Sequence, residues 1–237
     1  MVLREAAPSI DPGPSVDPSP AKLPQTVTLG GRFVTLFPLD PAVHAQPLYE
    51  KSHGPGCESL WRYLFDGPYP NRVAFDGRLA QMACSRDPLF FAILDQAKVP
   101  VGYTSFLRID PAHRCIEVGN ILYTPELQRT PGATEAMYLM ARHVFEDLGY
   151  RRYEWKCDAL NQPSRRAALR LGFTFEGIFR QHMIIKGRNR DTAWYSMLDS
   201  EWPQRKANFE QWLGSTNFDA EGRQKQSLAR IKGAPEV

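Results

Sequence analysis

Residues 157–173 read C-D-A-L-N-Q-P-S-R-R-A-A-L-R-L-G-F, and the organisation of the chain follows from this stretch. The pattern predicts that a strand ends in it, that a short helix begins near Pro163, and that Leu171-Gly172-Phe173 closes the helix. Asn161 and Ser164 fall at the junction of strand and helix, where polar side chains on a loop can face a ligand. We expect the remaining chain to supply the sheet and the anion-binding loop that this segment completes.

The composition predicts one domain with an ordinary core. The chain has 237 residues, of which 43% are hydrophobic and 11% aromatic, so a second full domain is not required. A formal net charge of +3 and a pI of about 8.7 suit anionic ligands such as nucleotides. There is no dense basic run of the kind that marks nucleic-acid-binding proteins, so we expect no nucleic-acid partner.

The cysteines and the apolar runs indicate a soluble, cytoplasmic protein with no membrane partner. The four cysteines are scattered without a C-x-x-C pair, which predicts free thiols, no disulfide framework and no metal site. The first thirty residues carry no apolar signal region. No apolar run approaches the roughly 20 residues that span a bilayer.

Three regions differ in composition. Residues 1–25 are rich in Pro, Ser, Ala and Asp, and their prolines exclude helix and strand pairing, which predicts a disordered Pro-rich tail. Residues 26–203 form the predicted domain. Residues 204–237 are polar and are expected to be a C-terminal extension, partly helical or disordered, with a short helix over 209–213 and a loose last twenty residues.

Hydrophobic periodicity predicts an α/β (α+β) fold. In order, we expect a strand over 32–38, helices over 41–52, 59–64 and 72–84, strands over 89–94, 99–109 and 115–123, a helix over 133–148, a strand over 150–158, a helix over 163–171, and a hairpin of strands over 173–186 and 191–198. Short turns make the three middle strands an antiparallel meander. The following strand, helix and strand imply a crossover and a parallel pair.

The loop Gln128-Arg-Thr-Pro-Gly-Ala133 leads directly into a predicted helix. The N-terminus of a helix offers unpaired backbone N–H groups and a partial positive charge, which together can cradle a phosphate. Taken alone this signal is weak, because many loops that contain one glycine precede helices.

Several ordered motifs together resemble the GNAT superfamily of N-acetyltransferases, and within it the ribosomal-protein N-acetyltransferase (RimJ/RimL-like) branch. The motifs are residues 128–133 followed by Thr134-Glu135-Ala136, then Asn161-Gln162-Pro163-Ser164, Leu171-Gly172-Phe173, Glu176-Gly177 and 191–198. The resemblance covers about residues 26–203 and is strongest from Glu117 to Leu198. It implies the GNAT fold: a mixed sheet of six to seven strands, splayed between the fourth (115–123) and fifth (150–157) strands and flanked by helices.

The resemblance implies acetyl-CoA as co-substrate and a phosphate loop of the pattern Gln/Arg-x-x-Gly-x-Gly/Ala. Gln128 and Ala133 match its ends, but Pro131 replaces the first glycine and Gly132 lies one place later, so one backbone N–H is missing. The predicted phosphate donors are the amides of Arg129, Thr130, Gly132, Ala133 and Thr134, with charge added by the Arg129 side chain.

The pantetheine arm of the donor is expected in the wedge between the splayed strands. The resemblance assigns the backbone near Ile121, Leu122 and Tyr123 to the arm and to polarising the thioester carbonyl. It assigns the Asn161 side chain to a pantetheine amide, although an N-cap for the following helix is a compatible alternative. Arg165, Arg166 and Arg170 decorate that helix. They form either a solvated face or, for one of them (Arg166 in our prediction), a contact to the 3′-phosphate.

Catalysis in the family is direct attack of a neutral amine on the thioester, with a base and an acid. Ser164 matches the serine proposed as the acid in this branch, and a capping hydroxyl is its alternative role. Glu117 is the first candidate for the base, and a cross-strand surface charge is its alternative role. His182 and Tyr123 are weaker candidates. Met183 falls where some relatives carry a glutamate, so the base is not simply carried over.

The expected acceptor is a small-molecule amine or a protein N-terminus, bound between the helices of residues 41–85 and the hairpin of residues 173–198. We expect a monomer or homodimer. Two alternatives remain open at this point. One is a non-catalytic acyl-CoA-binding or sensing module, motivated by Pro131, and the other is an interaction protein that uses its two terminal segments.

Overall fold

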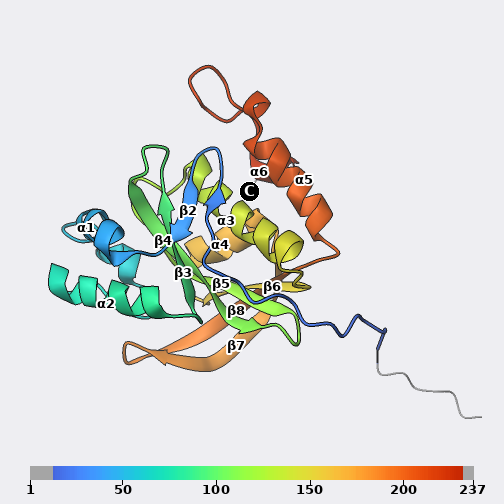
Figure 1. The fold of residues 1–237 in the computed structure, drawn as a ribbon, viewed down its shortest axis with the longest axis horizontal. Coiled ribbons are helices and arrows are strands. Elements are labelled where there is room, and N and C mark those ends of the chain that lie inside the picture. Colours follow the sequence, from blue (N-terminus) through green and yellow to red (C-terminus); the bar gives the residue numbers. More distant parts are fainter. Residues whose placement is uncertain (1–12, 232–237) are drawn as a thin grey trace, which may run out of the picture.

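The protein is described by a computed structural model over residues 13–231, as one eight-stranded sheet with helices on both faces (Figure 1). In the order β1-β2-β3-β4-β5-β6-β8-β7, the strands are β1 (Leu29–Gly30), β2 (Thr35–Pro38), β3 (Leu89–Leu94), β4 (Pro100–Asp110), β5 (Cys115–Tyr123), β6 (Arg152–Asp158), β8 (Arg188–Leu198) and β7 (Thr174–Ile185). The predicted fold class is confirmed. The sheet has one strand more than expected, because the two-residue β1 pairs with β2.

The helices match the predicted order closely. They are α1 (Pro41–Ser52), the 3₁₀ turn η1 (Glu58–Trp61), α2 (Arg72–Cys84), α3 (Pro131–Arg142) with a π-helical end η2 (His143–Asp147), α4 (Gln162–Leu171), α5 (Trp202–Leu213), the 3₁₀ turn η3 (Ser215–Asn217) and α6 (Leu228–Ile231). β3, β4 and β5 form the predicted antiparallel meander. The β5-α3-β6 crossover gives the predicted parallel pair.

Two hydrophobic cores lie on opposite faces of the sheet. One face packs against α3, α4, α5 and α6, and the other packs against α1, α2 and η1 (Figure 1). β6 shows how the sequence separates the faces, because side chains alternate along a strand. Tyr153, Trp155 and Cys157 are buried in the first core, whereas the charged residues between them point to the other face.

Helix α3 begins at Pro131, two residues before its predicted start. Thr130 is the N-cap, and its Oγ1 accepts a hydrogen bond from the Ala133 amide at 3.2 Å. A proline fits this first helical position, since the N–H it lacks has no partner within a helix. Pro131 therefore opens the helix rather than standing in the loop before it.

Glu135 fixes the start of the sheet against α3. Its buried carboxylate accepts three backbone hydrogen bonds, from the amides of Arg32 at 2.8 Å, Phe33 at 2.6 Å and Val34 at 2.9 Å. Gly132 allows this close approach, because a Cβ there would lie 2.7 Å from a methyl group of Val34. The turn before β2 thus packs directly on the first turns of α3.

Helix α4 ends as the opening stretch predicts. Gly172 is its C-cap with φ of 100°, the left-handed conformation that glycine adopts without steric cost. The Phe173 amide then donates to the carbonyl of Ala168 at 3.0 Å. Phe173 enters the core against Trp155, with ring centroids 5.7 Å apart.

The hairpin and the C-terminus differ from the predictions. β8 begins at Arg188, because Lys186 and Gly187 alone make the turn, both with positive φ as in a two-residue hairpin loop. The C-terminal segment is ordered: α5 starts at Trp202, and Trp212 and Leu228 are buried. The expectation of a loose end is therefore wrong for residues 218–231. Pro203 lies in the first turn of α5, a position that proline tolerates.

The N-terminal segment leads onto the domain before β1. Residues 13–20 are exposed, and residues 1–12 of the predicted tail lie outside the described part of the chain. The amides of Ala21 and Lys22 bond the carbonyls of Pro111 and Leu148, each at 3.0 Å. Within residues 13–231, no helix combines the length and the apolar character needed to cross a membrane.

Candidate active site

The parallel seam between β5 and β6 opens part-way along the strands. Pairing runs from Cys115 opposite Arg152 to Val118 opposite Trp155. Beyond that point both strands continue, and the described residues show no further register between them, although β4 and β8 stay paired on the outer sides. Backbone groups along such a seam can hydrogen-bond an extended ligand that lies where the next pairs would form. This is the predicted splay.

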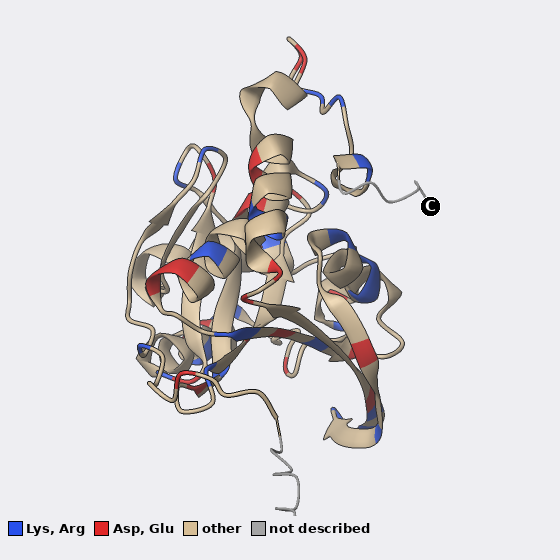
Figure 2. Cartoon of the chain, turned by 90° about the vertical axis from the view of Figure 1, so that its right-hand side faces the viewer, with Lys and Arg blue, Asp and Glu red and all other residues tan. Residues whose placement is uncertain are grey.

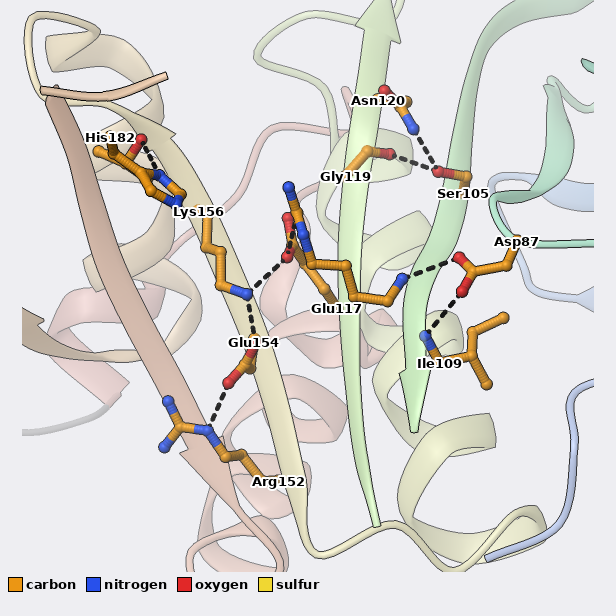
Figure 3. Close-up of polar contacts among 12 residues, drawn as sticks. Asp87, Ser105, Ile109, Glu117, Gly119, Asn120, Arg152, Glu154, Lys156 and His182 are labelled. Carbon is orange, nitrogen blue, oxygen red and sulfur yellow. Dashed lines mark hydrogen bonds and ion pairs between the residues drawn. The ribbon is translucent and has the colours of Figure 1, made fainter. Parts of the chain in front are cut away.

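A β-bulge accompanies the opening. The β4–β5 register shifts between Tyr103 and Ser105, and Asn120 has φ of 51°. Asn120 Nδ2 donates to Ser105 Oγ at 2.9 Å, and Ser105 Oγ donates to the Gly119 carbonyl at 3.2 Å (Figure 3). Bulges bend the strand that carries them, so this feature accounts for the departure of β5 from β6 after Val118.

Leu122 and Tyr123 lie on β5 beside the open seam, as predicted. The Leu122 side chain is buried in the second core. The Tyr123 hydroxyl donates to the Ala133 carbonyl on α3 at 3.1 Å, and burial raises the pKa of this phenol well above its usual value. Because both side chains are held elsewhere, the backbone is the part of these residues that can meet a ligand in the seam.

The phosphate loop differs from its prediction at two amides. The Thr130 amide donates to the Leu127 carbonyl at 3.3 Å, and the Ala133 amide is capped by the Thr130 side chain. Neither N–H is therefore available as predicted. Within residues 13–231, no hydrogen bond joins the amides of Arg129, Gly132 or Thr134 to an acceptor outside α3, so these three of the five predicted amides are left to face an anion. Gln128 supports the loop, since its Nε2 donates to the Tyr123 carbonyl at 3.0 Å.

Asn161 and Ser164 meet at the start of α4. Asn161 is the N-cap, and its Oδ1 accepts from the Ser164 amide at 3.2 Å. This leaves the Asn161 NH₂ group as the donor for a ligand. The Ser164 hydroxyl accepts from Trp155 Nε1 at 3.0 Å, and Trp155 is the last residue of β6 that pairs with β5. Ser164 therefore stands at the point where the seam opens.

The three arginines of α4 have separate surroundings. Arg165 donates to the Tyr195 hydroxyl at 3.1 Å and to the Ala159 carbonyl at 3.3 Å, which ties the helix to its neighbours. Arg166 is exposed, and no side-chain hydrogen bond or ion pair within residues 13–231 involves it. Arg170 Nη1 donates to Thr134 Oγ1 at 2.9 Å, so this guanidinium lies at the first turn of α3.

Glu117, the predicted base, lies in a ladder of ion pairs across the sheet (Figure 3). Its carboxylate is 2.6 Å from Arg108 Nη1 and 2.9 Å from Lys156 Nζ, and its side chain is only 4% exposed. Lys156 also contacts Glu154 at 2.6 Å, which relieves the repulsion between Glu117 and Glu154 directly opposite each other. Both cations contact the Glu117 carboxylate, so this group is engaged in ion pairs across the sheet. Its role as the base stays a prediction.

His182 lies on the same side of the sheet, on β7. Its Nδ1 is 2.9 Å from Thr192 Oγ1, and its ring stands 5.9 Å from that of Trp194. Desolvation lowers the pKa of this imidazole, and the charges of Arg108, Arg190 and Lys156 lower it further. His182 is therefore neutral at pH 7 and can accept a proton. Figure 3 shows it across from Lys156 and Glu117.

A segment between α1 and α2 covers this side of the site. The Lys186 ammonium at the hairpin turn donates to the Trp61 carbonyl at 2.7 Å, and the Tyr63 hydroxyl donates to the Leu160 carbonyl at 3.2 Å. The Arg190 guanidinium lies 5.2 Å from the ring centroid of Phe65. Residues 61–65 thus bridge the hairpin and the loop before α4.

An open trough lies on the hairpin beside His182. It has a volume of about 750 Å³ and is lined by Phe179, Arg180, Gln181, His182, Asn189 and Asp191. It offers an aromatic ring, an imidazole and groups of both charges to a partner molecule. Within the described residues, no group of three or more His, Cys, Asp or Glu side chains is placed to hold a metal ion.

Comparison with known proteins assigns the family. The family model described as "Acetyltransferase (GNAT) domain" matches residues 34–174, more than half of the chain. The chain belongs to the GNAT acetyltransferase family. A solved GCN5-related N-acetyltransferase from Brucella melitensis is 47% identical to this GNAT protein, covering 91% of this chain and 98% of that one, with a TM-score of 0.89.

Relatives of this GNAT protein include ribosomal-protein acetyltransferases, as the sequence predicted. The ribosomal-protein-serine acetyltransferase of Escherichia coli (strain K12) is 29% identical over 103 residues, 43% of this chain and 56% of that protein. The chain spans between 55% and 57% of the length of the curated relatives it matches. A RimL ribosomal-protein acetyltransferase solved in complex with coenzyme A shares the fold at 19% identity, with 73% and 98% coverage and a TM-score of 0.62.

Sequence reasoning missed three features of the site. The Trp155–Ser164 contact joins a residue that pattern analysis places in the core to one at a helix start. The contact of Arg170 with Thr134 brings together positions 36 residues apart. The third feature is the bulge at Asn120. The sequence holds one indication of it, because Gly119-Asn120 interrupts the apolar run of β5 and asparagine tolerates positive φ.

Proposed function

We propose that this GNAT protein transfers an acetyl group from acetyl-CoA to a primary amine by direct attack. The open β5–β6 seam supports the proposal, since Ser164 bonds Trp155 where the pairing ends, Asn161 caps the same helix, and β5 continues unpaired on this side through residues 121–123. The CoA-bound RimL neighbour, which shares the fold, supports CoA as the donor.

The residues at the seam fit the donor. An extended pantetheine arm carries amide groups that can pair with the backbone of β5 where β6 no longer does. The Asn161 NH₂ group supplies a further donor, because only its oxygen is used in capping α4. The amides of Arg129 and Gly132 and the positive end of α3 receive the pyrophosphate. Leu122 and Tyr123 hold the thioester end.

In the reaction the amine nitrogen attacks the thioester carbonyl carbon and the carbon–sulfur bond breaks. Backbone N–H groups near Leu122 stabilise the negative charge that develops on the carbonyl oxygen. Ser164 gives its proton to the departing CoA thiolate. The attacking nitrogen loses one proton to a base, directly or through water.

We propose that His182, and not Glu117, is the general base that accepts the proton from the amine. The imidazole is neutral and exposed beside the trough, whereas Glu117 is held by Arg108 and Lys156. The Thr192 hydroxyl beside Nδ1 fixes the ring orientation. Glu117 keeps a structural role in this proposal, because it joins β4, β5 and β6.

We propose that the acceptor is the N-terminal amine of a protein, in preference to a small-molecule amine. The named relatives that act on ribosomal proteins support this choice. The trough beside His182 is open, with a volume of about 750 Å³, and it is lined by the exposed ring of Phe179, which a peptide side chain could contact.

A second function is favoured by one observation, the phosphate loop. Pro131 lacks an N–H, and the Thr130 and Ala133 amides are occupied, so fewer donors face the pyrophosphate than the family pattern provides. A protein that binds acyl-CoA without turnover would fit such a loop.

The deciding experiment measures CoA release with a panel of small amines and of peptides with free N-termini, next to calorimetry of CoA binding. Turnover on any acceptor supports the transferase. Tight CoA binding with no turnover on the whole panel supports the binding module. Absence of CoA binding contradicts both. A deletion of residues 204–237 is not a clean test of the terminal segments, because Trp212 and Leu228 belong to the core.

A further inference from the structure

The β7–β8 hairpin carries an excess of positive charge toward its tip. Residues 179–191 include four basic residues and one acidic residue, Asp191. Figure 2 shows Lys and Arg in blue toward the end of this hairpin. The same stretch supplies all the residues that line the open trough beside His182. The trough at which the acceptor amine is proposed to react therefore belongs to a positively charged element.

We propose that the tip of the hairpin selects acceptors that carry carboxylates close behind their N-terminal amine, and that Arg180 and Arg188 bind these carboxylates. The inference rests on the proposed function, because it names the class of protein N-terminus that the transferase takes, an acidic one. A guanidinium can hold a carboxylate through two parallel N–H···O bonds. In an extended peptide, residues three to five lie about 7–13 Å from the first residue, and Arg180 is two positions from His182 on β7.

Both arginines are free to take a carboxylate. Arg180 and Arg188 are exposed, and within residues 13–231 no ion pair or side-chain hydrogen bond involves either of them. Arg180 lines the trough, and Arg188 precedes Asn189, which also lines it. Because side chains alternate along a strand, Arg188 lies on the same face of β8 as Arg190.

The two other basic residues of the hairpin are held by uncharged groups. The Lys186 ammonium donates to the Trp61 carbonyl at 2.7 Å. Arg190 Nε donates to Thr192 Oγ1 at 3.2 Å, and its guanidinium lies 5.2 Å from the ring centroid of Phe65. Neither cation has a carboxylate at ion-pair distance in the part of the chain that the structure describes. Their charges therefore add to those of the two exposed arginines.

The acidic side chains around the hairpin already have partners. Asp191 Oδ1 accepts from the Gln181 amide at 2.7 Å and from Asn189 Nδ2 at 3.0 Å. Asp66, on the segment that faces the hairpin, is paired with Arg78 at 2.7 Å. One carboxylate among four cations leaves the hairpin positive, and an added carboxylate would be attracted to it.

The base lies within this positive surrounding. Desolvation is the first cause of the lowered pKa of His182, and the charges of Arg108, Arg190 and Lys156 lower it further, whereas Glu117 raises it. An acceptor brings an N-terminal ammonium to the same place, and like charges repel. Carboxylates two to four residues behind the amine compensate for that repulsion, so an acidic segment fits the trough better than a basic one.

A cluster of basic residues can also attract the phosphates of RNA. The peptide is favoured here because the cluster surrounds the trough that holds the proton acceptor His182. Binding of single-stranded RNA also uses aromatic rings on which bases stack. The ring of Phe179 is instead stacked against Trp194, with centroids 4.4 Å apart.

The test compares three decapeptides with free N-termini that differ only at positions three to five, where all three residues are Glu, Gln or Lys. The measured quantity is kcat/KM for the peptide at saturating acetyl-CoA. At low ionic strength we expect the Glu peptide to exceed the Gln peptide by about five- to twentyfold, since each of two exposed ion pairs contributes about two- to fivefold. The Lys peptide should be the slowest. At about 0.5 M NaCl the preference should fall to within about twofold, because salt screens exposed charges.

Variants of the full chain assign the preference to the two arginines. In Arg180→Gln/Arg188→Gln the ratio of the Glu peptide to the Gln peptide should fall to within about twofold. Arg180→Lys/Arg188→Lys keeps both charges and should keep most of the preference. Arg180→Glu/Arg188→Glu should reverse it, so that the Lys peptide exceeds the Glu peptide. Arg86→Gln is the control, because it removes the same charge from an exposed residue that does not line the trough, and it should keep the wild-type ratio.

Three outcomes overturn the inference while the proposed function stands. They are rates for the Glu and Gln peptides within twofold of each other in the wild type at low ionic strength, an unchanged preference in Arg180→Gln/Arg188→Gln, and an equal loss of preference in Arg86→Gln. Tighter binding of an oligouridine of about twelve nucleotides than of the Glu peptide, lost in the same double variant, would assign the cluster to RNA and also overturn it. No turnover of any of the three peptides would instead contradict the proposed acceptor, and this inference with it.

Discussion

Trp155 donates its indole N–H to the hydroxyl oxygen of Ser164 at 3.0 Å, at the point where β5 and β6 part. The bond uses one lone pair of the serine and leaves its proton for another acceptor. A hydroxyl that accepts such a bond is polarised and becomes a better donor. Trp155 itself is fixed by burial and by Phe173, so it orients Ser164 toward the seam.

Trp155→Phe removes this N–H and keeps the ring. We expect kcat to fall by about three- to tenfold, as for one neutral hydrogen bond, with KM for acetyl-CoA within about twofold. Ser164→Ala should cost more, and Trp155→Phe should add nothing in that background. The cycle is measured as initial rates at saturating acetyl-CoA. If Trp155→Phe lowers kcat by the same factor in the wild type and in Ser164→Ala, the indole contributes through packing and not through its hydrogen bond to Ser164.

Glu117→Gln separates the two roles of this residue. As a base, Glu117 would lose about 100-fold in turnover on substitution. If Glu117 is only an ion-pair partner, the substitution should lower the unfolding free energy by about 1–3 kcal/mol, because buried Lys156 loses one carboxylate partner. Turnover should then stay within about tenfold of the wild type. Glu154→Gln is the matched variant, since Glu154 also contacts Lys156. We expect both variants to melt at lower temperature and to keep similar rates. A large loss of turnover in Glu117→Gln but not in Glu154→Gln would assign the role of general base to Glu117.

Local signals in the sequence were enough for most of the fold. Asp40 followed by Pro41 marks a helix start that the structure places at Pro41, and the alternation along 152–157 separates the two faces of β6. The splay followed from the family resemblance rather than from any residue pattern. The strand count was one short because a two-residue strand such as β1 has no periodicity to detect.

The site chemistry depends on contacts that no local pattern encodes. Glu117 is flanked by Arg108 on β4 and Lys156 on β6, so its ionic partners become visible only once the sheet is assembled. The capping of Ala133 by Thr130 needed the true start of α3, which the proline obscured. The stacking of Arg170 on Trp212 required the position of α5 in the fold, whereas the sequence predicted only a short helix over 209–213 and no packing for it.

Asn161 allows capping and ligand binding to be separated. Asn161→Asp keeps an oxygen for the Ser164 amide and removes the NH₂ donor. We expect its melting temperature to match the wild type and its KM for acetyl-CoA to rise by about tenfold. Asn161→Ala should show the same KM change and also lose about 1 kcal/mol of stability. If Asn161→Asp binds CoA normally, the residue is a helix cap and no more.

We expect replacement of the Glu135 carboxylate to lower the unfolding free energy more than replacement of any other carboxylate discussed above. Glu135→Gln keeps one acceptor oxygen for three backbone amides in a buried position, so one or two N–H groups lose their partner. We expect a loss of about 2–4 kcal/mol in unfolding free energy, measured by urea denaturation. Glu221→Gln is the control, because that carboxylate is exposed and pairs with Arg223 at the surface. Comparable losses in the two variants would contradict the anchoring role.

If His182 is the general base, kcat/KM should fall on the acid side of its pH profile, and we call this fall the acid limb. The base must be neutral, and its pKa lies below 6.5, so activity is present at pH 7 and is lost as the pH falls through that lowered value. His182→Gln should remove the limb along with most of the rate. Arg108→Gln removes a positive charge and releases the Glu117 carboxylate, and both changes raise the pKa of His182. The limb should then move to higher pH, and a limb that stays in place in Arg108→Gln would assign the base elsewhere.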